Sequence, residues 1–114
     1  MTPSQRPTDI ARDVLDIEGA ALARLRDEMP ESFDIVADLL LNVPGRVIVS
    51  GMGKSGHIAA KIAATMASTG TPAQYVHPGE ASHGDMGMIT SADAVILISN
   101  SGETRELADI IGHT

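Results

Sequence analysis

The 114 residues provide for one domain, with 43% hydrophobic and 20% charged residues and a formal net charge of −7. A chain with this negative charge does not neutralise a phosphate backbone, which excludes general nucleic-acid binding. Local groups such as helix N-termini can still bind a small anion. The lack of cysteine excludes disulfides and thiol chemistry and fits a reducing cytoplasm. With no signal-peptide pattern at the N-terminus and no long apolar run for a membrane helix, we expect a soluble cytoplasmic protein.

Two helices are predicted before the first strand. Residues 1–8 are interpreted as a disordered tail that ends at an N-cap, Thr8 or Asp9. An amphipathic helix then continues to about position 29, where Pro30 ends it. Its apolar residues recur at spacings of three and four, at Ile10, Val14, Ile17, Ala21 and Leu25. A second helix is predicted over residues 31–42, with inward-facing side chains at Phe33, Val36, Leu39, Leu40 and Val43.

A glycine-rich loop between a predicted strand and a predicted helix is the most informative stretch. A β-branched run predicts the strand over residues 46–50, and an Ala/Ile-rich run predicts the helix over residues 55–68. Glycines let the backbone approach a ligand closely, the first N–H groups of the helix can meet an anion, and Lys54 adds a cation. We interpret the loop as a site for a phosphate ester or sugar phosphate, in which Lys54 is functional and not merely a solvated surface charge.

The same loop satisfies the dinucleotide-binding fingerprint Gly51-x-Gly53-x-x-Gly56. That fingerprint also requires an acidic residue about 20 residues on, which hydrogen-bonds a ribose. Residues 69–75 contain no carboxylate, so the dinucleotide interpretation is less favoured. His57, one turn into the helix, is interpreted as structural or merely exposed.

Two more polar loops follow predicted strands over residues 73–76 and 94–98. The first loop has two imidazoles and two carboxylates, which can bind a metal ion or move protons, although their spacing matches no standard zinc signature; they are His77, Glu80, His83 and Asp85. The second, residues 99–104, places three hydroxyls before a short helix over residues 105–111. These hydroxyls can wrap a phosphate, or Ser101 can simply cap the helix.

Strands that alternate with helices predict an α/β fold with right-handed crossovers and a parallel sheet. Because ligands of such sheets bind at the carboxyl ends of the strands, we expect the three polar loops to converge there. Glu106 lies one turn beyond Glu103 on the last helix, so one of the two can point at the site. For Glu103 we favour a stabilising interaction with the helix N-terminus.

Four motifs in this order and spacing closely resemble the sugar isomerase (SIS) domain of bacterial arabinose 5-phosphate isomerases. They are Gly51-Met-Gly-Lys-Ser-Gly-His, Ala67-Ser-Thr-Gly-Thr-Pro, His77-Pro-Gly-Glu-Ala-Ser-His-Gly-Asp and Ile98-Ser-Asn-Ser-Gly-Glu. The resemblance implies a three-layer α/β sandwich with a parallel sheet of flavodoxin-like topology, preceded by N-terminal helices. It also implies interconversion of D-arabinose 5-phosphate and D-ribulose 5-phosphate through an enediol, which feeds synthesis of the lipopolysaccharide sugar Kdo.

The resemblance further implies roles for individual residues. The catalytic residues would be Lys54, Glu106 and His83. The substrate-binding residues would be Gly70, Thr71, His77, His83, Ser55, Ser99, Ser101 and Thr104. No cofactor would be required, although His77 would also contact zinc in some members, as an inhibitory rather than a required ion.

The family pattern continues beyond residue 114 through further strands and helices and, usually, two regulatory CBS modules. We therefore interpret residues 9–114 as the N-terminal part of an SIS domain that is incomplete at its C-terminus, without CBS modules. The first hypothesis is an isomerase that works as a homo-oligomer, a tetramer, in which neighbouring subunits complete the sites. The alternatives are a non-catalytic sugar-phosphate-binding or regulatory module, or an inactive fragment.

Overall fold

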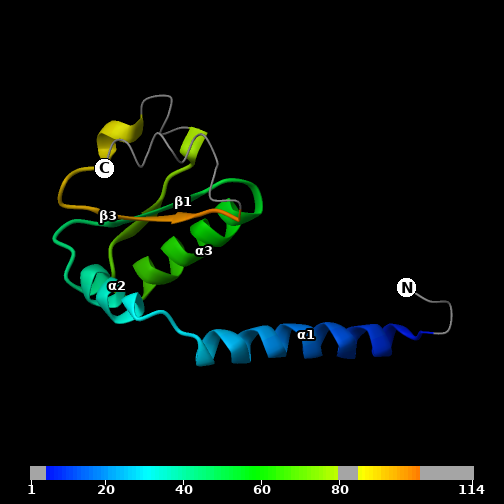
Figure 1. The fold of residues 1–114 in the computed structure, drawn as a ribbon. Coiled ribbons are helices and arrows are strands. Elements are labelled where there is room, and N and C mark those ends of the chain that lie inside the picture. Colours follow the sequence, from blue (N-terminus) through cyan, green and yellow to red (C-terminus); the bar gives the residue numbers. More distant parts are fainter. Residues whose placement is uncertain (1–4, 80–84, 101–114) are drawn as a thin grey trace. The chain divides into compact units, whose positions relative to one another are not determined.

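A parallel β-sheet with a helix packed on one face forms the part of the chain that carries the predicted motifs. A computed structural model describes residues 5–79 and 85–100. The chain divides into two units between Ile35 and Val36, and each is described by itself. The first unit contains helix α1 (Pro7–Asp27), helix α2 (Ser32–Leu41) crosses the boundary, and the sheet belongs to the second unit (Figure 1).

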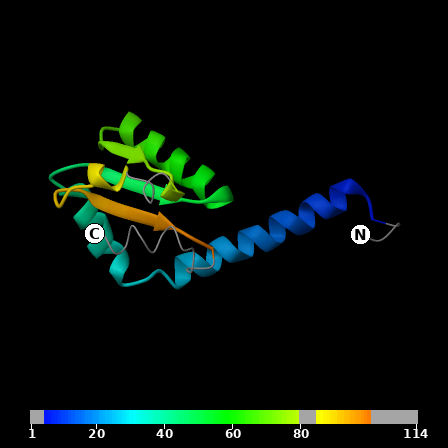
Figure 2. The same ribbon diagram turned by 90° about the horizontal axis from the view of Figure 1, so that it is seen from above.

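The sheet has the parallel topology expected from the sequence. Strand β1 (Val47–Gly51) lies in the centre, and β2 (Ala73–Tyr75) and β3 (Ala94–Ile98) pair with it in parallel on either side. Figure 2 shows the three strands running in the same direction, so their carboxyl ends share one edge. This confirms the predicted α/β class and all three predicted strands.

The two faces of the sheet are covered differently. Helix α3 (Gly53–Ser68) packs on one face, where its small residues Ala59 and Ala63 lie against the buried side chains of Val47 and Val49. The short 3-10 helix η1 (Asp85–Met88) lies over the other face. On that face, Ile48 forms a buried cluster with Val76 and Ile89. Successive side chains of β1 point to opposite faces of the sheet, so this strand contributes to the core on both faces.

The start of α1 differs slightly from the predicted one. The helix begins at Pro7 with Arg6 as its N-cap residue, and not after Thr8 or Asp9. Proline suits the first helical position because its missing N–H has no partner there in any case. The Arg6 N–H donates to the Asp9 carboxylate over 3.3 Å, which places Asp9 inside the first turn. The tail prediction for residues 1–4 lies outside the described residues.

The apolar stripe predicted on the first helix is not buried, and the inward-facing side chains predicted on the second helix are buried only in part. No residue of α1 is buried, and Ile17 is 70% exposed. Beyond Ile35, Leu40 and Val43 pack against the sheet core as predicted, whereas Leu39 is 56% exposed. The predicted inward position is wrong for Val36, which is 49% exposed, whereas the partly exposed Leu39 lines a hollow together with Val43, Ala94 and Val95. Among the described residues, no helix combines the length and apolar character of a membrane span.

Arg46 and Asp93 connect the segments at the edge of the sheet where the strands begin. The Asp93 carboxylate, 4% exposed, accepts hydrogen bonds from the backbone N–H groups of Arg46 (2.8 Å) and Thr90 (2.9 Å). The Arg46 guanidinium donates to the Gln74 side chain and to the Met88 carbonyl oxygen, and its Nη2 lies 3.7 Å from Asp93. The bonds from the Arg46 and Thr90 backbones hold the pKa of Asp93 below its usual value.

Candidate functional site

The glycine loop turns the chain from the carboxyl end of β1 into α3. Gly51 ends the strand, Met52 is extended, and Gly53 begins the helix with φ of +59°, in the left-handed region that favours glycine. Helix α3 thus begins two residues before the predicted start. Met52 carries no side-chain oxygen to cap the first N–H groups of α3, so these groups remain suited to an anionic ligand.

The other two glycines of the loop are required for close packing. A Cβ at Gly51 would lie 2.9 Å from the carbonyl oxygens of both Ile98 and Ser55. A Cβ at Gly56 would lie 2.7 Å from the Gly51 carbonyl oxygen and 3.0 Å from the Tyr75 hydroxyl. Real Cβ atoms essentially never come within 3.0 Å of such atoms. The first turn of α3 therefore packs directly on the ends of β1 and β3 because residues 51 and 56 lack side chains.

A small pocket opens beside this loop, between α3 and the carboxyl end of β2. Its volume is about 280 Å³, near the lower limit for small-molecule sites and thus of a size for a small ligand. The described residues that line it are Gly53, Gly56, His57, Ala60, Tyr75 and His77. The pocket therefore combines a helix N-terminus with two imidazoles and a phenol ring.

His77 has a defined hydrogen bond in this pocket. The backbone N–H of Gly79 donates to Nδ1 of the half-buried His77 ring over 2.9 Å. A Cβ at Gly79 would lie 3.0 Å from the same nitrogen, so glycine permits this close approach. His77, predicted to bind substrate, thus lines the pocket in a fixed orientation.

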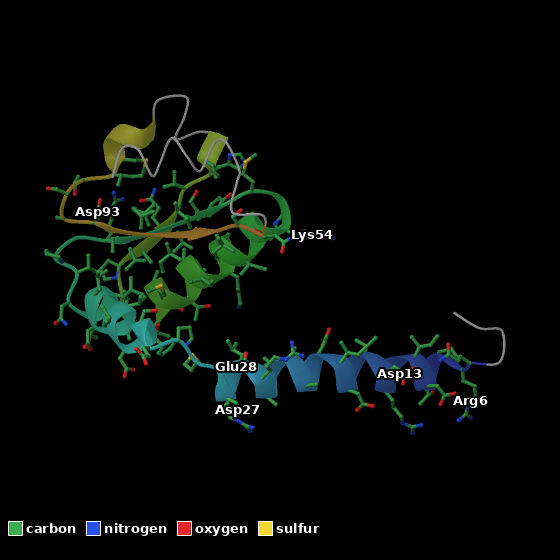
Figure 3. The ribbon with its side chains drawn as sticks, in the orientation of Figure 1. Arg6, Asp13, Asp27, Glu28, Lys54 and Asp93 are labelled. Carbon is green, nitrogen blue, oxygen red and sulfur yellow. The ribbon has the colours of Figure 1, made fainter. Side chains whose placement is uncertain are left out.

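The other predicted residues of the carboxyl edge lie around the loop. Figure 3 shows Lys54 at the end of the sheet where β1 leads into α3, and its side chain is exposed and is not among the residues that line the pocket. Ser55 follows in the first turn and is half-buried. Ser99, also half-buried, follows β3. The order of the strands reverses between β1 and β3, and ligands of such sheets often bind at this position.

Gly70 and Thr71 lie at the opposite edge of the sheet. They follow α3 and precede β2, whose first residue, Ala73, is level with the first residue of β1. A helix of 16 residues is roughly 24 Å long, so it separates Gly70 from the glycine loop by about that distance. One chain does not bring Gly70 and Thr71 to the His77 pocket, and their predicted role stays a prediction.

Several predicted residues lie outside the described part of the chain. These are Glu80, His83, Ser101, Glu103, Thr104 and Glu106, together with the predicted last helix. Within the described residues, no three His, Cys, Asp or Glu side chains gather as a metal site requires. The predicted zinc contact of His77 stays a prediction.

Two ring-bearing residues of the pocket, His57 and Tyr75, were not expected there from the sequence. His57 was interpreted as structural or exposed, and Tyr75 was assigned only to a strand. The signal for His57 is its spacing of four residues from Gly53, which places both on one face of α3. Tyr75 is the chain's single tyrosine and the last residue of a strand in a parallel sheet, a position next to the ligand edge.

A second hollow, of about 540 Å³, lies at the edge where the strands begin. Among the described residues that line it, Asp93 is the only ionisable one, and its carboxylate is already bonded to Arg46 and Thr90. A carboxylate without a cation directed into the hollow does not suit an anionic ligand. The site at the carboxyl edge is therefore the better candidate.

A parallel sheet with a glycine loop, a helix N-terminus without a side-chain cap and a small pocket at the strand ends is the arrangement of ligand-binding domains of the α/β class. The model of the SIS domain family matches residues 40–113, and the chain belongs to this family.

Relatives with curated names match over most of the chain. The chain is 56% identical over 100 residues to an arabinose 5-phosphate isomerase of Yersinia pestis and 52% identical over 100 residues to one of Escherichia coli K12. Each match covers 88% of this chain and 30% of the relative. The chain thus spans less than a third of the length of these relatives.

Solved structures have a similar fold. A protein of Escherichia coli CFT073, in complex with arabinose 5-phosphate, superposes with a TM-score of 0.79 at 43% identity, over 96% of this chain and 58% of that one. A Listeria monocytogenes protein, provisionally named a sugar-phosphate isomerase, superposes with a TM-score of 0.84 at 27% identity, over 96% of this chain and 60% of that one.

Proposed function

We propose that this chain is the N-terminal part of an aldose–ketose isomerase that interconverts D-arabinose 5-phosphate and D-ribulose 5-phosphate. The observation that carries the proposal is the identity of more than half of the aligned residues to arabinose 5-phosphate isomerases. The small pocket at the carboxyl edge supports it, because its size and its helix N-terminus suit a sugar phosphate.

The reaction moves hydrogen between two neighbouring carbons of the open-chain sugar. A base removes the proton from C2 of the aldose, the C1 oxygen gains a proton, and an enediol forms. The C2 hydroxyl then loses its proton as a C2 carbonyl forms, and C1 receives a proton. A carboxylate or imidazole can carry the carbon-bound proton, and a cation can stabilise the developing enediolate. We assign the proton to Glu106 or His83 and the charge stabilisation to Lys54.

The phosphate would bind at the beginning of α3. Ser55 lies in the first turn of α3 and Ser99 follows β3 at the same edge of the sheet, so we assign their hydroxyls to the phosphate, and Ser101 and Thr104 are assigned the same role. Because α3 separates Gly70 and Thr71 from this site, their proposed contact with substrate requires a neighbouring subunit. This requirement supports the proposed homo-oligomer, for which we propose a tetramer located in the cytoplasm.

A sugar-phosphate-binding module without turnover is the second candidate. It is favoured by the position of Lys54, whose side chain is exposed and does not line the described pocket. In this alternative the helix N-terminus and the hydroxyls hold the phosphate, and the lysine has no chemical step to assist.

Substitution of Lys54 separates the two functions. Isomerisation of arabinose 5-phosphate is measured with the purified 114-residue chain, its Lys54→Ala variant and, as control, Lys61→Ala, which removes another exposed lysine of α3. The isomerase proposal expects a fall in turnover of about 10²–10³-fold for Lys54→Ala, with phosphate binding largely kept and Lys61→Ala unchanged. Binding of arabinose 5-phosphate without turnover, equally in all three proteins and also in a chain extended to the length of the relatives, would support the module; turnover in the extended chain alone would show that these 114 residues are an inactive part of the isomerase.

A further inference from the structure

The hydrogen bond at His77 determines which of its two ring nitrogens carries the proton. A neutral imidazole has one N–H donor and one lone pair. Because the Gly79 N–H donates to Nδ1 over 2.9 Å, the lone pair lies on Nδ1 and the proton on Nε2. The tautomer thus follows from one backbone donor two residues along the chain.

We propose that His77 acts in the pocket as a fixed Nε2–H donor to an oxygen of the ligand and is not preorganised to bind zinc. Gly79 is the positioning residue, since its N–H sets the tautomer and its missing side chain lets that N–H approach the ring. The nature of the ligand rests on the proposed function, whereas the tautomer rests on the hydrogen bond alone.

The hydrogen bond has the wrong direction for a metal site. A histidine that binds a metal through one nitrogen almost always donates its other N–H to a carboxylate, a carbonyl or water. At His77 the second nitrogen instead faces a donor, so binding zinc through Nε2 would move the proton to Nδ1 and break the bond from Gly79. The other imidazole of the pocket, His57, is exposed, and no group of three potential ligands accompanies the pair among the described residues. The zinc contact suggested by family resemblance is therefore not supported by this geometry.

The tautomer can be read directly by nuclear magnetic resonance. Long-range proton–nitrogen correlation of the histidine rings distinguishes the Nε2–H from the Nδ1–H form, and the His77→Gln variant assigns the signals among the chain's four histidines. We expect the Nε2–H form at a pH where the ring is neutral, and no change of the His77 signals when stoichiometric zinc is added. The Nδ1–H form, or a zinc-induced shift of the Nε2 signal, would overturn the proposal. Neither outcome depends on whether the chain is an isomerase.

Two substitutions test the donor. In His77→Gln the side-chain amide can place an N–H near the position of Nε2, whereas in His77→Asn the amide reaches only the position of Nδ1 and can still accept from Gly79. We expect binding of arabinose 5-phosphate, measured by calorimetry, to weaken about 10-fold in His77→Asn and less than about threefold in His77→Gln, as for the loss of one hydrogen bond. Equal affinities in the two variants would contradict a donor role. Turnover is not part of this readout, so absent isomerase activity would count against the proposed function only.

Discussion

The Tyr75 hydroxyl donates a hydrogen bond to the carbonyl oxygen of Gly51 over 3.0 Å. The bond joins the last residue of β2 to the last residue of β1. It passes close to Gly56, where a Cβ would lie 3.0 Å from the same hydroxyl. Tyr75 also lines the pocket. One side chain thus holds the beginning of the glycine loop and forms part of the wall of the candidate site.

Tyr75→Phe is expected to lower the free energy of unfolding by about 1 kcal/mol, because it removes the hydroxyl and leaves the Gly51 carbonyl oxygen without this donor. Urea unfolding followed by circular dichroism measures the loss. Affinity for arabinose 5-phosphate should fall as well, since the loop is held less firmly. If neither stability nor affinity changes, the hydrogen bond does not hold the loop.

Gly56→Ala is expected to destabilise the second unit by about 1–3 kcal/mol, because the new methyl group meets the Gly51 carbonyl and cannot be accommodated without a shift of backbone. Gly19→Ala is the matched control, since Gly19 lies in the exposed interior of α1 with nothing within 4 Å of an added Cβ. The control should increase helix content, because alanine favours a helix interior by about 1 kcal/mol over glycine. Equal effects of the two substitutions would contradict the packing argument.

Substitutions at Gly53 are expected to be limited by the backbone conformation and not by the room for a side chain. Its φ is +59°, yet an added Cβ would meet nothing within 4 Å. Gly53→Ala should therefore cost about 1 kcal/mol of backbone strain, and Gly53→Asn less, because asparagine tolerates the left-handed region better. Chemical denaturation of the two variants gives the comparison. A larger loss in Gly53→Asn than in Gly53→Ala would indicate a steric limit that the structure does not show.

Asp93 is expected to make stability depend on pH in the acid range. Its pKa is lowered in the folded chain, so its contribution is complete above the ordinary value of 3.8 and is lost as the pH falls through the lower folded value. Asp93→Asn should destabilise the chain at neutral pH, where the carboxylate accepts two backbone N–H groups, and should make the acid transition less steep. Asp13→Asn, on the exposed surface of α1, is the control. Unfolding curves from strongly acidic to neutral pH that keep the same pH dependence in both variants would refute the assignment.

Local patterns in the sequence were sufficient for the class of fold. The β-branched run at β1, the apolar run at β3 and the glycines between β1 and α3 each predict their element from a few neighbouring residues, and parallel pairing follows from the helix between β1 and β2. Lys54 and His77 were placed at the ligand edge for the same reason. Element ends moved by one or two residues, as at Gly53, because caps and left-handed residues depend on local geometry.

Only the tertiary structure could decide which residues meet. Periodicity predicts that Leu39 and Leu40 belong to an apolar stripe, but which of them reaches the sheet depends on how α2 approaches it. The pocket, the bond from Tyr75 to Gly51 and the tautomer of His77 depend on distances between strand ends and loops. The sequence by itself determined the elements and their order, because these are local preferences. The contacts of the site were decided by packing, because a hydrogen bond is lost when its donor and acceptor move apart by a few ångströms.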